Sequence, residues 1–306
     1  MTDQSAVLVP GAWRHHFVAA NGARFHVAEA APAAVDPAAP APLVLLLPGY
    51  PQNWWAWRAQ LPALAEAGYR AVAMDLRGTG ASDKPPHGYD MPTLAQDVLG
   101  VIRSLGAAEA VVVGHGVGGA VAWTVAAAAP QHVRAVVAVS APYPPHLSSG
   151  VLVRAMATRS ATRHVLAVLA PGRPERTHTR GDGVTRILTD GYADRSPDRD
   201  VVATWQAFAR VPFAAHSAAE TVRWLVRSTP RPDGRRWRSE LAEVSVPVLQ
   251  LHGTADPFLP ARRVRHEVGE PYRFALIDGA GHFPAEERPD AVTAALLAWL
   301  GSLPGR

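Results

Sequence analysis

A short glycine-rich segment, residues 114–119, has the spacing of a catalytic turn. It reads Gly-His-Gly-Val-Gly-Gly, follows an apolar run at residues 110–113 and leads into a helical pattern at residues 117–129. A buried strand, a turn of small residues and a helix together form the context of a nucleophile elbow, G-x-Nu-x-G. Serine, aspartate or cysteine belongs at the centre of that turn, and here the central residue is Gly116. The sequence therefore predicts a catalytic turn without a nucleophilic side chain.

The same glycines also fit a dinucleotide-binding fingerprint, G-x-G-x-x-G. That fingerprint needs an acidic residue at the end of the next strand. Here the next apolar run ends with Val-Ser-Ala-Pro at residues 139–142. The chain has no cysteine, and its histidines lack the spacing of a zinc site. We therefore expect no nucleotide, metal or other cofactor.

The elements that would position this turn alternate along the chain. Residues 14–19 and 24–29 are typical of a hairpin, and buried strands are expected at residues 43–47, 71–74, 110–113 and 135–139. Helical patterns separate them, and strands at residues 246–251 and 274–277 and a helix at residues 291–300 follow later. Between these parts, residues 144–238 give helical patterns alone. The sequence predicts an α/β fold with a mainly parallel sheet and a helical cap, divided as core 1–143, cap 144–238 and core 239–306.

Four further segments, with the turn, resemble epoxide hydrolases and the related dehalogenases of the α/β-hydrolase family. Residues 47–55, LPGYPQNWW, resemble the oxyanion segment, and residues 75–82, DLRGTGAS, resemble the family's D-x-R-G-x-G-x-S turn. Residues 251–257, LHGTADP, resemble the acid-bearing loop, and residues 279–284, GAGHFP, resemble the histidine loop. The motifs occur in the family's order, and most follow an expected strand.

The resemblance implies a role for each matching residue. His282 matches the general base, and Asp256 matches the acid that orients it. The backbone N–H groups of Tyr50 and Val117 match the oxyanion hole and do not depend on the side chain at Gly116. The bond between Tyr50 and the following proline is expected to be cis.

The sequence also departs from the family. Aspartate is expected at position 116 in the epoxide-hydrolase branch, and histidine in place of Pro48. Val117 is not a halide ligand, so a dehalogenase is disfavoured. The family opens epoxides with two cap tyrosines, for which this chain offers Tyr192 and, at the edge of the cap, Tyr143. With Trp54 and Trp55, these tyrosines are the candidate substrate-binding residues.

Three interpretations of Gly116 remain open. His282 and Asp256 can act without a covalent nucleophile on a small apolar molecule. Alternatively, the chain is an inactive ligand-binding pseudoenzyme, or a hydrolase in which the nucleophile was substituted. The 306 residues, 48% hydrophobic and 18% charged, are typical of a globular protein. We expect a cytoplasmic monomer or homodimer with a small-molecule ligand and neither nucleic acid nor membrane as a partner.

Overall fold

The computed structural model describes residues 3–33, 40–146, 158–228, 230–241, 244–265 and 267–303. Part of the expected cap, residues 147–157, therefore lies outside the described residues. Eight strands form one sheet in the order β1-β2-β4-β3-β5-β6-β7-β8. Strands β1 and β2 pair antiparallel, as do β2 and β4, whereas every other pair is parallel. The predicted α/β class and mainly parallel sheet are confirmed.

The strands run in chain order as β1 (Arg14–Ala20), β2 (Ala23–Ala30), β3 (Leu43–Leu47), β4 (Arg70–Met74), β5 (Ala110–His115), β6 (Val133–Val139), β7 (Val248–Gly253) and β8 (Tyr272–Ile277). The central strands are mainly apolar because helices cover both faces of the sheet. Strand β7 begins two residues later than the sequence indicates. Pro247 precedes it, and proline has no N–H to donate to a neighbouring strand.

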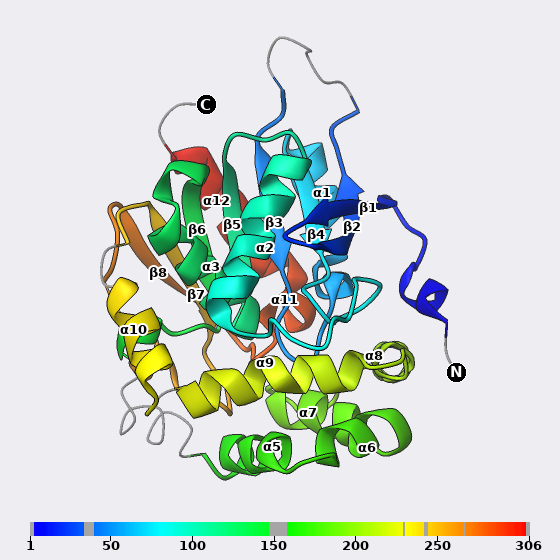
Figure 1. The fold of residues 1–306 in the computed structure, drawn as a ribbon. Helices are drawn as coiled ribbons and strands as arrows, with labels where there is room; N and C mark the ends of the chain where they lie inside the picture. Colours follow the sequence, from blue (N-terminus) through cyan, green and yellow to red (C-terminus); the bar gives the residue numbers. More distant parts are fainter. Residues whose placement is uncertain are drawn as a thin grey trace.

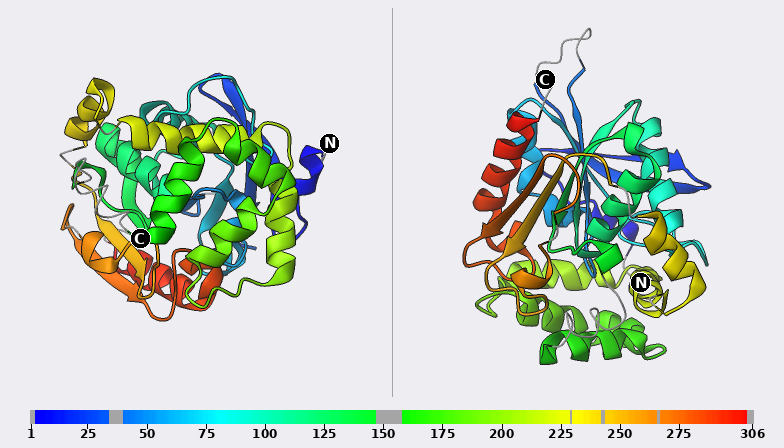
Figure 2. Two further views of the ribbon diagram at one scale, coloured as in Figure 1. Left: turned by 90° about the horizontal axis from the view of Figure 1, so that it is seen from below. Right: turned by 90° about the vertical axis from the view of Figure 1, so that its left-hand side faces the viewer.

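Two helical layers cover the sheet (Figures 1 and 2). Helices α2 (Met91–Ser104) and α3 (Gly116–Ala128) pack on one face, and α1 (Gln60–Glu66) and α12 (Pro289–Ser302) pack on the other. Alternation along each strand divides the apolar side chains between two cores. Leu45 and Val112 face α2 and α3, whereas Leu46 and Val113 face α1 and α12.

The cap lies across the end of the sheet at which the parallel strands terminate (Figure 1). It contains α5 (Arg159–Leu169), α6 (Arg173–Arg180), α7 (Gly183–Gly191), α8 (Arg199–Ala209), α9 (Ala214–Ser228) and α10 (Pro232–Glu240). Short 3₁₀ helices lie at Gln4–Val7, Trp54–Trp57, Pro130–His132, Pro144–His146 and Ala261–Arg263, and α11 spans Pro284–Glu287. Ligands of parallel α/β folds bind at this end of the sheet. None of the described helices is both long and apolar enough to cross a membrane.

Candidate active site

Gly116 lies at the turn between β5 and α3, as the motif predicts. Its φ is +50°, in the left-handed region that favours glycine. A Cβ added at Gly116 would meet only the Cα of Gly49, at 3.8 Å. The position therefore has room for a side chain, although its backbone would strain one.

Asp256 and His282 form a hydrogen-bonded pair beside this turn. The Nδ1–H of His282 donates to Oδ2 of Asp256 over 2.8 Å, which leaves Nε2 of a neutral imidazole as an acceptor. The other carboxylate oxygen accepts the N–H groups of Phe258 at 2.8 Å and Leu259 at 2.9 Å. Burial by itself would raise the pKa of Asp256, but the charge and hydrogen bond of His282 bring that pKa below its usual value. Asp256 is thus a fixed, ionised partner for the imidazole.

A second histidine, His115, holds the main chain of His282. Its Nε2–H donates to the carbonyl oxygen of His282 over 2.8 Å. Burial lowers the pKa of His115 to about 3, so its ring is neutral at ordinary pH. This contact gives His115 a structural role.

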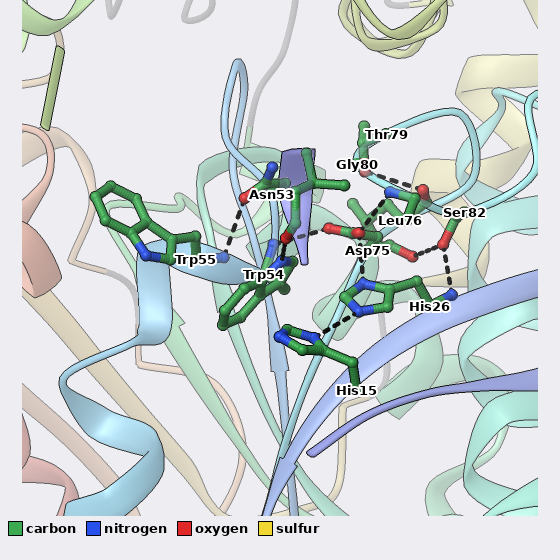
Figure 3. Close-up of polar contacts among 12 residues, drawn as sticks. His15, His26, Asn53, Trp54, Trp55, Asp75, Leu76, Thr79, Gly80 and Ser82 are labelled. Atoms are coloured by element: carbon green, nitrogen blue, oxygen red, sulfur yellow. Dashed lines mark hydrogen bonds and ion pairs between the residues drawn. The ribbon is translucent and has the colours of Figure 1, made fainter. Parts of the chain in front are cut away.

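The loop that follows β3 is fixed by Asp75 (Figure 3). The fully buried carboxylate of Asp75 accepts the N–H of Trp54 at 2.9 Å, the N–H of Ala81 at 2.8 Å and the Nδ1–H of His26 at 2.7 Å. Ser82 donates its hydroxyl to the carbonyl oxygen of Asp75. This network ties the β4 turn to the segment that carries Tyr50, and the peptide bond after Tyr50 is cis, as expected.

A cavity of about 250 Å³ lies between the turn at Gly116, the histidine loop and the cap. Tyr50, Gly116, Val117 and His282 all line it. Cap side chains close it with an apolar wall formed by Val165, Val168, Ile187, Val222 and Leu225. The cavity suits a small, mainly apolar ligand.

Among the described residues that line the cavity, none is a carboxylate or a lysine. Ser140, at the end of β6, supplies the one aliphatic hydroxyl. Its Oγ is buried and has no hydrogen-bond partner, so no base activates it.

A third imidazole on the cavity, besides those of His282 and His115, was not expected from the sequence. His164 of α5 donates its Nε2–H to Oδ2 of Asp190 over 2.7 Å. The rings of His164 and His282 both contact Phe258, with centroids 5.4 and 5.0 Å from its ring. Burial lowers the pKa of His164 despite Asp190, so the neutral form dominates and its Nδ1 is an acceptor. No spacing in the sequence indicated this pair, because its two residues meet only when α5 packs beside the end of α7.

None of the four aromatics expected to bind substrate is among the described residues that line this cavity. Trp54 is fully buried beside the Asp75 network, and Trp55 packs against Trp205. Tyr143 packs on Trp123, and its hydroxyl donates to the carbonyl oxygen of Leu241, which directly follows α10. Tyr192 is buried against Phe283. Each of these large side chains fills a core space that local sequence does not reveal.

Tyr50 is the one tyrosine among the described lining residues. Its hydroxyl is hydrogen bonded to Nε2 of His178 on α6 over 2.8 Å, which joins the core to the cap. Burial lowers the pKa of His178 to about 4 and raises that of Tyr50, so both groups are neutral. Within the described part of the chain, no three acidic or histidine side chains are arranged to hold a metal ion.

Comparison with known proteins agrees with this architecture. Residues 42–289 match the family model of the alpha/beta hydrolase fold. Epoxide hydrolase A of Mycobacterium tuberculosis is 34% identical over 330 residues, covering 96% of this chain and 99% of that protein. Epoxide hydrolase 3 of Xenopus tropicalis is 33% identical over 82% of this chain and 69% of its own length. The crystal structure of epoxide hydrolase A from Mycobacterium thermoresistibile, 28% identical, covers 96% of this chain and 100% of its own with a TM-score of 0.78. The chain belongs to the α/β-hydrolase fold family, as an epoxide-hydrolase-like member.

Proposed function

We propose that this protein hydrolyses a small apolar epoxide by direct attack of water, with His282 as the general base. Asp256 orients the imidazole and stabilises its protonated form. Gly116 stands where a relative with covalent chemistry carries its nucleophile, and the space beside it accommodates the attacking water. The observation that carries the proposal is the His282–Asp256 pair, which lines an apolar cavity next to that space.

The proposed step needs a base and a proton donor. Nε2 of His282 takes a proton from water while the oxygen of that water bonds to a ring carbon. The ring C–O bond breaks, and the released oxygen takes a proton to complete a diol. His164 can supply this proton only when it is itself protonated, because its Nε2–H is already given to Asp190. Epoxide opening by this route therefore requires His164 in its protonated form and His282 in its neutral form at the same time.

The rate enhancement available without a covalent nucleophile is large enough for an enzyme. General-base catalysis contributes about 10²–10⁴-fold. A backbone oxyanion hole contributes about 10²–10³-fold for each donor. For a carbonyl substrate, the N–H groups of Tyr50 and Val117 are the proposed donors, and no proton from His164 is then required.

A direct test compares the native protein with His282→Ala on styrene oxide, 1,2-epoxyhexane and 4-nitrophenyl acetate. His87→Ala, a change at an exposed histidine, is the matched control. We expect turnover by the native protein and the control and its loss in His282→Ala. Equal rates in all three proteins would refute the assignment of His282.

The alternative is a ligand-binding protein without turnover, and the apolar wall of the cavity favours it. It predicts binding of the same epoxides or their diols with an affinity that His282→Ala barely changes. Gly116→Asp tests the third interpretation. Epoxide hydrolysis by that variant alone, with an ester trapped on the new aspartate, would identify a silenced hydrolase.

A further inference from the structure

Glu287, the last residue of α11, holds the main chain on both sides of His282. Its Oε2 accepts the N–H of Gly281 over 2.9 Å, and its Oε1 accepts the N–H of Phe283 over 3.1 Å. With the carbonyl oxygen of His282 held by His115, the peptide groups around the base have defined partners. One carboxylate thus fixes the direction from which the imidazole leaves the main chain.

The same carboxylate also binds the cap. Oε2 of Glu287 accepts the N–H of Ala193 over 2.8 Å, just beyond the end of α7. In return, the N–H of His282 donates to the carbonyl oxygen of Gly191 over 2.7 Å. The histidine loop is therefore joined to the cap by two hydrogen bonds that run in opposite directions.

Glycines allow this close approach. A Cβ at Gly281 would lie 2.3 Å from the oxygen of Gly191 and 2.6 Å from the nitrogen of Ala193. A Cβ at Gly191 would lie 2.4 Å from the ring of Phe283. Larger residues at either position would push the cap segment and the histidine loop apart.

Cap residues 190–193 therefore contact both the imidazole of His164 and the loop that carries His282. Asp190 binds His164, while the residues after it bind the main chain of His282 and the carboxylate of Glu287. The relative placement of the two histidines depends on this segment.

We propose that Glu287 is a positioning residue that couples the seating of the cap to the orientation of His282. Its effect on rate rests on the proposed function, whereas its effect on the orientation of His282 does not. Displacing a catalytic group by about 1 Å costs about 10²-fold in rate. Loss of Glu287 is therefore expected to lower kcat and leave KM nearly unchanged.

The test uses Glu287→Ala and Glu287→Gln, with Glu286→Gln as the matched control. Glu286 is the neighbouring buried glutamate. It accepts hydrogen bonds from Trp205 of the cap and from Arg58, and so joins cap and core without its side chain bonding to the histidine loop. We expect kcat to fall about 10²-fold in Glu287→Ala and less in Glu287→Gln, whose amide oxygen still accepts. Glu286→Gln should lower Tm without this loss of kcat.

A second measurement does not depend on turnover. In protein labelled with ¹⁵N-histidine, the Nδ1–H of His282 is protected from exchange with water by its bond to Asp256 and should give an NMR signal. That signal should be lost or displaced in Glu287→Ala and retained in Glu286→Gln. An unchanged signal and kcat in both Glu287 variants, or equal changes in Glu286→Gln, would overturn the proposal. Displacement of the signal in a protein that shows no turnover would uphold the positioning and refute only the proposed function.

Discussion

Replacing Asp256 by asparagine changes the chemistry of His282 with little change in shape. The amide oxygen of asparagine can still accept the N–H groups of Phe258 and Leu259, which now bind Oδ1 of Asp256. Its NH₂ group would then face Nδ1 of His282, where a carboxylate oxygen lies at 2.8 Å. A donor opposite Nδ1 favours the tautomer with its proton on Nε2, and that tautomer cannot accept a proton from water.

The expected loss is limited by what a general base contributes. We expect kcat/KM to fall about 10²–10⁴-fold, which corresponds to about 2.7–5.5 kcal/mol in activation free energy. The free energy of unfolding should fall by about 1.5–3 kcal/mol, because a charge-assisted hydrogen bond is lost. The rate effect is therefore separable from unfolding if rates are measured well below the melting temperature.

The assay is initial-rate hydrolysis of styrene oxide, with urea denaturation of each protein. Asp278→Asn, a change at an exposed aspartate of the neighbouring loop, is the control and should retain the native rate. A folded Asp256→Asn protein with the native kcat/KM would show that the orientation of His282 does not limit the reaction.

Three further outcomes follow from contacts in the core and the cap. Asp75→Ala leaves the N–H groups of Trp54 and Ala81 without their acceptor and should cost about 3–5 kcal/mol in urea denaturation. Gly116→Leu places a side chain in the space beside the cavity, so calorimetry should show weaker binding of 1-phenylethane-1,2-diol, together with about 1–2 kcal/mol of backbone strain. The pKa of His178 is lowered to about 4, so the unfolded chain takes up a proton before the folded protein does, and stability should fall as pH drops from about 6.5 to 4. His178→Gln should flatten that fall in Tm, and an equally steep loss would contradict this assignment.

Local motifs made the sheet and the turn at Gly116 predictable. Each motif lies within a few residues of a buried strand, and parallel strands bring their ends together. The cis bond after Tyr50 was expected on a different ground, because proline in a tight functional turn can adopt it.

The cap wall could not be predicted in this way, because its residues meet through helix packing. His164 and Asp190 lie on different helices, and the role of Glu287 depends on main-chain groups of the cap. The surroundings of Trp54 depend on sheet pairing instead: its ring fills a core space beside His15 and His26, which come from β1 and β2.

The most direct test of the account is the source of oxygen in the first turnover. Excess enzyme in H₂¹⁸O is mixed with styrene oxide, and the diol is analysed by mass spectrometry. Direct attack of water activated by His282 predicts one ¹⁸O atom in the diol from the first turnover. An unlabelled diol under these single-turnover conditions, with ¹⁸O appearing in the diol only when substrate is instead in excess, would show that a side chain of the protein supplies the oxygen and would contradict a mechanism without a covalent nucleophile.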